Sequence, residues 1–263
     1  GPVERRMSLR ATILGCGTSG GVPRIGNEWG ACDPNNPKNR RRRCALLVER
    51  HGRDGVTRVL VDTPPDLREQ LLDAKVGLLD GVLYTHDHAD HVHGIDDLRI
   101  VAYNGRRRVD VFFDETVAPA LRQRFAYCFE QPEGSEYPSV LNACHIRPGE
   151  MVRIEGPGGV IEAMPFLQRH GAGNTLGFRF DGIAYSPDVN DFPDAALPYL
   201  EGLDVWILDA LRYTGHPSHL TVEQALSWIE RLKPRRAILT TLHIDLDYET
   251  LSAQLPPHVV PAY

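Results

Sequence analysis

Short apolar runs separated by turn residues dominate the chain, and they predict a structure rich in β-strands. Each run is mostly apolar and often β-branched, and glycine, proline, asparagine or aspartate lies between successive runs. The pattern predicts strands at Ala11–Leu14, Ala45–Glu49, Arg58–Asp62, Gly81–Thr85, Val109–Phe113, Val152–Ile154, Leu176–Phe180, Ile183–Tyr185, Val205–Leu208 and Ala237–Thr240.

Helical periodicity is sparser and predicts helices at Asp66–Ala74, Val117–Tyr127 and Thr221–Lys233. The last of these has the strongest signal, because Thr221 and Gln224 form a capping box and Pro234 ends the helix. Its apolar stripe comprises Val222, Ala225, Leu226, Ile229 and Leu232. Strands first, then alternating strands and helices, indicate an α/β fold with two sheets covered by helices.

Length and composition suit one large domain over residues 1–263, because 42% of the residues are hydrophobic. Gly1 and Pro2 resemble a protease-cleavage remnant, so residues 1–6 are expected to be an expression scar or leader, and Met7 is the candidate native start. No apolar stretch approaches the roughly 20 residues that a membrane span needs. We therefore expect no membrane association.

Charge and cysteine content indicate which partners and which cellular location to expect. The net charge of -6 provides no basic field to attract nucleic acid, so nucleic acid is not expected as a partner. The five cysteines form no paired framework, and no signal peptide is evident. We therefore expect reduced thiols and a cytoplasmic protein.

Residues Thr85 to His91 read T-H-D-H-A-D-H and directly follow a predicted strand. In extended backbone His86 and His88 point to the same side, so two imidazoles can bind one ion. Asp90 and His91 lie beyond the strand end, where a turn or helix start can direct them to a second ion. The spacing predicts a metal site.

This run resembles that of the metallo-β-lactamase superfamily of hydrolases. Residues 11–23, A-T-I-L-G-C-G-T-S-G-G-V-P, are similar to the opening strand and glycine-rich turn of its phosphodiesterase and tRNA-processing branches. The likeness extends to the cyclic-phosphate phosphodiesterase branch of the phosphonate (C–P lyase) pathway. It implies an αβ/βα four-layer sandwich, with two mixed sheets flanked by helices and metals at one edge between the sheets.

Further ligand candidates lie where later strands end. His170, Asp188 and His243 occur in the order of the family's remaining metal motifs. Thr241 stands where the family usually has a metal histidine, so we expect the loop to shift and bring in His243. The resemblance implies two divalent ions, Zn²⁺ or Mn²⁺, the first held by His86, His88 and His170, the second by Asp90, His91 and His243, with Asp188 bridging them.

Three further residues are candidates near these ligands. Asp62 ends a strand before Thr-Pro-Pro and can accept hydrogen bonds from the histidine loop, orienting a ligand. His219 directly precedes the capped helix, where a positive helix end favours phosphate. The resemblance implies a non-ligand catalytic histidine in this loop, and His216 is the competing candidate.

The arginine run and the cysteines allow more than one interpretation. Residues Arg40 to Arg43 are either a solvated face or a source of substrate contacts, with Arg43 as the candidate. Members of the phosphonate branch have a structural zinc on clustered cysteines, but here Asn27 and Trp29 occupy two of those places and Cys32 alone is a cysteine. One thiolate is too few for such a site, so we expect it to be absent.

The residues together predict a metal-dependent hydrolase acting on a small, cyclic or nucleotide-like phosphodiester through a metal-bridging hydroxide. Asp90 or Asp188 would orient the hydroxide, and His219 would offset charge or protonate the leaving group. Three rival functions share the scaffold or the motif: a tRNA 3′-processing nuclease, a thioester or lactone hydrolase, and a non-catalytic metal- or nucleotide-binding sensor. The resemblance also implies a homodimer.

Overall fold

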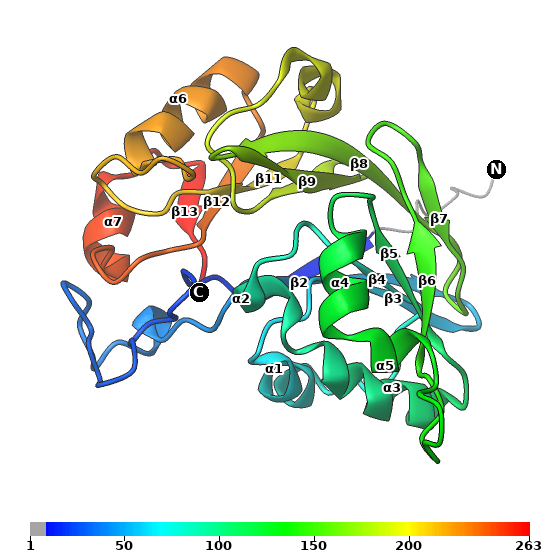
Figure 1. Ribbon diagram of the computed structural model, residues 1–263. Coiled ribbons are helices and arrows are strands. Elements are labelled where there is room, and N and C mark those ends of the chain that lie inside the picture. The colour runs from blue at the N-terminus through cyan, green and yellow to red at the C-terminus, as the bar shows by residue number, and fades with distance from the viewer. Residues whose placement is uncertain (1–8) are drawn as a thin grey trace.

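Two β-sheets face each other in the computed structural model, which describes residues 9–263 (Figure 1). In the first sheet β1, β2 and β3 are antiparallel, and β3 to β6 are parallel. Its strands lie side by side in chain order: β1 Leu9–Gly15, β2 Ala45–Gly52, β3 Gly55–Val61, β4 Gly81–Leu83, β5 Val109–Phe113 and β6 Leu141–His145.

The second sheet combines an antiparallel half, β7 to β10, with a parallel half, β10 to β13. Its strands are again neighbours in chain order: β7 Val152–Ile154, β8 Ile161–His170, β9 Gly173–Phe180, β10 Ile183–Ser186, β11 Val205–Asp209, β12 Arg236–Thr240 and β13 Val259–Pro261.

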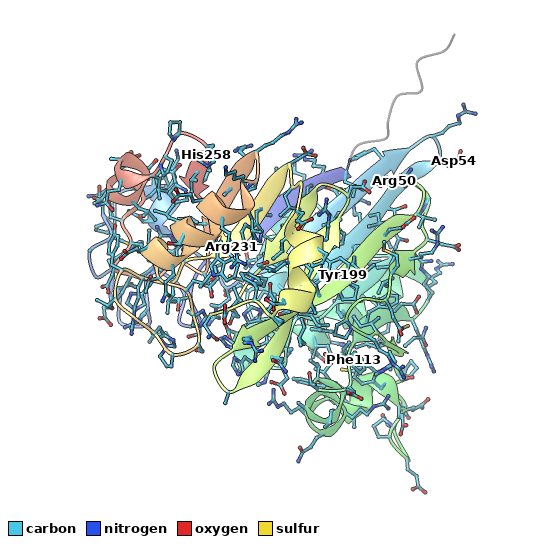
Figure 2. All side chains as sticks on the ribbon, turned by 90° about the horizontal axis from the view of Figure 1, so that it is seen from above. Arg50, Asp54, Phe113, Tyr199, Arg231 and His258 are labelled. Atoms are coloured by element: carbon cyan, nitrogen blue, oxygen red, sulfur yellow. The ribbon has the colours of Figure 1, made fainter. Side chains whose placement is uncertain are left out.

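Helices cover the outer face of each sheet (Figure 1). The first sheet carries α1 Leu67–Ala74, α3 Leu98–Gly105, α4 Ala118–Arg124 and α5 Ala126–Phe129. The second carries the 3-10 helix η3 Asp194–Leu200, α6 Val222–Leu232 and α7 Tyr248–Gln254. Tyr199 of η3, labelled in Figure 2, stacks on Phe166 of β8 with ring centroids 6.4 Å apart. The predicted α/β four-layer sandwich is confirmed.

Alternation along β2 explains why its sequence is an unbroken apolar run. Leu46 and Val48 belong to the core between the sheets, whereas Ala45 and Leu47 pack beneath the helices of the first layer. All four are at most 1% exposed. Because side chains alternate and both faces are covered, every position of the strand is selected for burial.

The best-supported helix forms as predicted. Thr221 Oγ1 accepts the backbone N–H of Gln224, and the Gln224 side chain accepts the N–H of Thr221. The helix ends at Lys233, whose backbone is left-handed. These caps satisfy groups that a helix leaves unpaired.

Every predicted strand is present, but several elements were not predicted. The strands β6, β8 and β13 and the helices α3 and α7 are additional. The strand β8 was not predicted because it contains Pro165, and a proline, which has no backbone N–H to donate, argues against a central strand. The pairing of β7 with β8 ends at Ala163, so the missing N–H of Pro165 falls on an unpaired edge. The predicted helix Val117–Tyr127 is broken at Phe125, where the backbone is no longer helical.

The predicted remnant at residues 1–6 and the candidate start Met7 lie outside the described residues. None of the helices within residues 9–263 is both long enough and apolar enough to cross a membrane.

Candidate metal centre

The T-H-D-H-A-D-H run leaves the buried strand β4 and enters the short helix α2 Ala89–Val92. His86 and His88 lie in the connecting loop, with His88 at the cap position of α2, while Asp90 and His91 lie in its first turn. His170 is the last residue of β8, and Asp188 follows β10 with a left-handed φ of 49°. Three strand ends therefore supply these six side chains.

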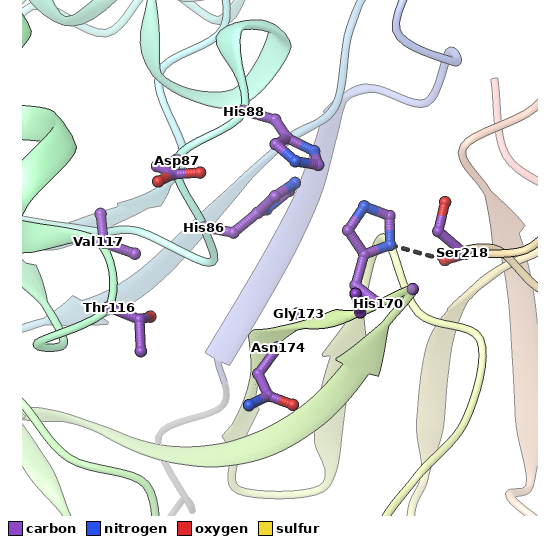
Figure 3. Close-up of a pocket in the computed structure, with 11 residues that line it drawn as sticks. His86, Asp87, His88, Thr116, Val117, His170, Gly173, Asn174 and Ser218 are labelled. Carbon is purple, nitrogen blue, oxygen red and sulfur yellow. Dashed lines mark hydrogen bonds between the residues drawn. The ribbon is translucent and has the colours of Figure 1, made fainter.

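The six side chains form two groups of possible metal donors that share Asp188. Within each group the donor atoms all lie within 4.8 Å of one another. The two groups are His86, His88, His170 and Asp188, and Asp90, His91 and Asp188. In Figure 3 the rings of His86, His88 and His170 point toward a common space.

Unpaired buried atoms at this centre fit a cation. Within the described residues, His86 Nε2, His91 Nε2 and Asp188 Oδ1 are buried without a hydrogen-bond partner. His170 Nδ1 donates to the backbone oxygen of Ser218 at 2.6 Å (Figure 3), which leaves its Nε2 lone pair available. Buried polar atoms without partners are costly, and metal ligation would satisfy these.

The ionisation of the donors also suits a cation. Burial lowers the pKa of His170 to about 4, and burial also lowers the pKa of His88, so both are neutral at pH 7 and can coordinate. Burial opposes charge on His91, but the carboxylates of Asp188, Asp90 and Asp62 outweigh it and raise the pKa of His91 well above its usual value. Without an ion, a proton must therefore balance these acids.

Asp62 lies behind the two donor groups and is linked by hydrogen bonds to two of the histidines. It is fully buried, with φ 67°, and accepts hydrogen bonds from Thr85 N at 2.9 Å, Thr85 Oγ1 at 2.7 Å and His91 Nδ1 at 2.6 Å. Since the Thr85 hydroxyl donates to Asp62, it must accept from His86 Nδ1, which lies 2.9 Å away. Asp62 therefore holds the Nε2 lone pairs of both His86 and His91 toward the centre.

His219 lies beside the first group and is paired with an aspartate that the sequence did not single out. Its Nδ1 is 2.6 Å from Oδ2 of the fully buried Asp209, and its ring centroid is 4.9 Å from that of His170. Burial would lower the pKa of His219, but the charge of Asp209 outweighs it and raises that pKa to about 9. Asp209 ends β11 as Asp62 follows β3, so the same strand-end signal could have revealed it.

The structure differs from the expectation for His243. Within the described residues, His243 belongs to neither donor group. Its Nε2 instead accepts a hydrogen bond from Arg24 Nη2 at 2.7 Å. Thr241 has a left-handed φ of 61°, and its buried hydroxyl has no hydrogen-bond partner in the described chain. The imidazole of His243 is therefore hydrogen-bonded to Arg24 and does not join either donor group of the described chain.

Arginines of the predicted run make structural contacts. Arg41 is 2% exposed and donates to the backbone oxygens of His243 and Leu246. Arg43 pairs with Asp66, with Nε 2.7 Å from Oδ2. His216, the other candidate for substrate binding, lies next to His219 with ring centroids 5.0 Å apart.

Cys32 lies in a small apolar cluster with Val22 and Ile244, and Trp29 packs against it. Its thiol donates to the backbone oxygen of Ile244 at 3.2 Å. An apolar contact thus joins the glycine-rich loop to the loop after β12 at this point.

A cavity of 560 Å³ opens beside the first donor group (Figure 3). His86, His88 and His170 form one wall. Thr116 and Val117 lie across the cavity from His170, and Asn174 and the turn Gly171–Gly173 also line it. The cavity gives a small molecule direct access to the metal-binding side chains.

Comparison with known proteins identifies the family. Residues 57–244 match the model of the β-lactamase superfamily domain. The chain belongs to the metallo-β-lactamase superfamily. The match spans the strand ends that carry both donor groups, and the chemistry of these groups fits divalent ions.

Solved structures of the superfamily resemble the chain over most of its length. A diphosphatase from the PhnP family is 34% identical, with a TM-score of 0.86 over 97% of this chain and 95% of that one. Zn²⁺-bound PqqB from Methylobacterium extorquens shares the fold at 16% identity, with a TM-score of 0.72 over 97% and 98%.

A curated relative, an octanoyltransferase from Porphyromonas gingivalis, is 32% identical over 97% of this chain. The match covers 50% of that protein, so the chain spans about half the length of this relative.

Proposed function

We propose that the protein hydrolyses a small phosphodiester, and that the phosphoanhydride bond of a diphosphate diester is the first bond to test. The observation that carries this proposal is the His219–Asp209 ion pair directly beside a paired donor centre. A fixed imidazolium next to two cation sites suits a reaction that builds negative charge on phosphoryl oxygens and expels an alkoxide or phosphate.

The donor groups would hold two divalent ions that share Asp188. Histidines combined with carboxylates suit Zn²⁺ or Mn²⁺. Ions held there would supply hydroxide near neutral pH by lowering the pKa of water, and would offset charge on the phosphoryl oxygens.

The chain's own residues would position and move the protons. Asp90 and Asp188 would accept hydrogen bonds from the attacking water and orient its oxygen toward phosphorus. As the bond from phosphorus to the leaving oxygen breaks, His219 Nε2–H would donate its proton to that oxygen. Asp209 keeps His219 charged and correctly turned, because it holds Nδ1 at 2.6 Å.

The 34% identity to a diphosphatase over 97% of the chain supports a diphosphate substrate. The octanoyltransferase name belongs to a protein about twice as long, half of which has no counterpart in this chain. Acyl transfer through a thioester would need a reactive thiolate, but burial raises the pKa of Cys16, Cys32, Cys44, Cys128 and Cys144.

A nuclease and a thioester or lactone hydrolase fit the structure less well. A tRNA-processing nuclease would need a basic surface, whereas the net charge is -6. A thioester or lactone hydrolase has no need of the His219–Asp209 pair.

The free thiols accord with the cytoplasmic location that we propose. Light scattering would test the implied homodimer.

Metal-dependent turnover tests the proposal. The protein is freed of metal, reloaded with Zn²⁺ or Mn²⁺, and assayed on bis-p-nitrophenyl phosphate, on a diphosphate diester, and on thioester and lactone substrates. We expect metal-stimulated hydrolysis of the phosphate esters only. No such activity on any phosphate ester would refute the proposal.

A variant pair then tests the assignment of His219. His219→Ala should lower kcat on bis-p-nitrophenyl phosphate by about 100-fold, within the usual range for a general acid, and keep the metal content. His258→Ala, at an exposed position labelled in Figure 2, is the control. Loss of metal in the His219 variant would show that this residue is a ligand instead.

A further inference from the structure

Arg24 is a half-buried cation without an acidic partner. It lies in the loop after β1 that contains the glycine-rich turn, and its Nη2 donates to His243 Nε2 at 2.7 Å. Across residues 9–263, no carboxylate oxygen lies within 4.0 Å of its guanidinium. Nearby Arg43, by contrast, is neutralised by Asp66. The guanidinium of Arg24 therefore keeps its charge available for an anion.

Arg212 is a second such cation, on the loop after β11. Its side chain is half-buried and donates to the backbone oxygens of Thr214 and Gly215, and the described chain offers it no carboxylate within 4.0 Å either. Burial is the largest cause that lowers the pKa of His243, and the guanidinium charges of Arg24 and Arg212 lower it further. His243 N also donates to the backbone oxygen of Leu211 at 3.0 Å, so the loop that carries Arg212 lies against the same histidine that Arg24 contacts.

A row of imidazole rings connects this region to the metal centre. Ring centroids are 5.3 Å apart from His86 to His170, 4.9 Å from His170 to His219 and 5.0 Å from His219 to His216. Arg212 Nη2 donates at 2.8 Å to the backbone oxygen of Gly215, the residue before His216. The cationic rim, defined as Arg24, Arg212, His216 and His243, thus begins next to the proposed catalytic pair.

The rim is positive although the protein as a whole is negative. Asp245 is the acid beside it, 3.3 Å from His243 Nδ1, with its side chain 52% exposed. One exposed carboxylate leaves two guanidinium charges uncompensated, while the whole chain has a net charge of -6. An arginine guanidinium can donate two parallel N–H groups to two oxygens of one phosphate, and partial burial strengthens such contacts. The rim therefore suits a dianionic phosphate group.

We propose that Arg24 and Arg212 bind a second phosphate group of the substrate, remote from the phosphorus that is attacked at the donor centre. The inference rests on the proposed function and deepens it, because it restricts the substrate to compounds with at least two phosphoryl groups. His243 acts as a positioning residue, since its Nε2 accepts from Arg24 and sets the direction of the guanidinium.

Binding measurements test this without depending on turnover. Titration calorimetry on the Mn²⁺-loaded protein compares methylenediphosphonate, which has two phosphonate groups, with methylphosphonate, which has one. We expect Arg24→Gln and Arg212→Gln each to weaken methylenediphosphonate binding at least tenfold and to change methylphosphonate binding by less than threefold. Arg24→Lys should give an intermediate loss of methylenediphosphonate affinity, because lysine keeps the positive charge but lacks the paired N–H donors of a guanidinium.

Arg153→Gln is the matched control, because Arg153 pairs with exposed Glu162 on the β7–β8 hairpin. It should leave both affinities unchanged. Circular dichroism and metal analysis confirm that each variant is folded and loaded. Equal binding of the two phosphonates by the unmodified protein, or equal binding by all variants, would overturn the proposal.

Steady-state kinetics on two esters test the proposal independently of the calorimetry. Thymidine 5′-(p-nitrophenyl phosphate) is compared with the same ester carrying a 3′-phosphate. We expect the added phosphate to raise kcat/KM at least tenfold, and the two arginine variants to lose this advantage while they retain hydrolysis of the simpler ester. An advantage that survives both substitutions contradicts the proposal. Absence of hydrolysis for every ester would refute the proposed function instead, while the calorimetry still decides the phosphate-binding role.

Discussion

Replacing Asp62 by Asn should weaken metal binding, although Asp62 itself is not proposed to touch an ion. The carboxylate accepts three hydrogen bonds, from Thr85 N, Thr85 Oγ1 and His91 Nδ1. The positive φ of 67° is tolerated by Asn, so the backbone is expected to keep its shape. The amide oxygen can still accept from Thr85 N, but the NH₂ group then faces His91 Nδ1–H, a donor against a donor.

The consequence is a change of tautomer. His91 can avoid the conflict by moving its proton to Nε2, and this removes the lone pair that the ion needs. The chain from Asp62 through the Thr85 hydroxyl to His86 Nδ1 is disturbed in the same way. Loss of such a supporting group typically weakens metal binding about 10- to 100-fold. This corresponds to about 1.4 to 2.8 kcal/mol.

Competition with a chromophoric chelator measures the Zn²⁺ affinity of each variant, and elemental analysis gives the number of ions per chain. Asp80→Asn is the matched control, because Asp80 directly precedes β4, at the end opposite to the histidine loop, and accepts from Arg58 N at 2.8 Å. Its side chain is 8% exposed. The control should lose stability but keep Zn²⁺ affinity. An Asp62 variant that binds Zn²⁺ as tightly as the unmodified protein would refute the tautomer argument.

Three further predictions concern the His219 pair and the fold. Asp209→Asn removes the charge that raises the pKa of His219 to about 9, so the alkaline limb of a kcat–pH profile should move from near 9 toward 6.5, and an unchanged profile would contradict the pairing. Burial raises the pKa of Asp247, but hydrogen bonds from Asp33 N and Thr250 outweigh it and lower that pKa to about 2. Asp247 therefore stabilises the fold above pH 3.8, and this contribution is lost as the pH falls through 2, so urea midpoints of Asp247→Asn and the unmodified protein should converge as the pH falls. In Gly94→Ala the new Cβ would lie 1.9 Å from the backbone oxygen of Pro64, and the urea midpoint should drop by the equivalent of about 1–3 kcal/mol.

The sequence by itself determined the parts of the protein that depend on local pattern. Strand runs, the capped helix at Thr221 and the T-H-D-H-A-D-H segment are visible because burial and ligand spacing leave a short-range signature. Asp188 could be found because it lies just after a predicted strand, whereas His170, at the end of the unpredicted β8, was found from the order of the family's metal motifs. Pro165 shows the limit of this approach: a local rule argued against β8, while the edge that permits the proline is created by the neighbouring strand β7.

Only the tertiary structure decided which distant side chains meet. Arg24 and His243 are separated by 219 positions, and nothing in either segment indicates that the guanidinium would take the imidazole lone pair. Asp209 and His219 are near in sequence, but their contact depends on how the loop after β11 folds back across the sheet edge. Strand pairing and packing between the sheets bring such loops together, and these long-range contacts have no local pattern in the chain.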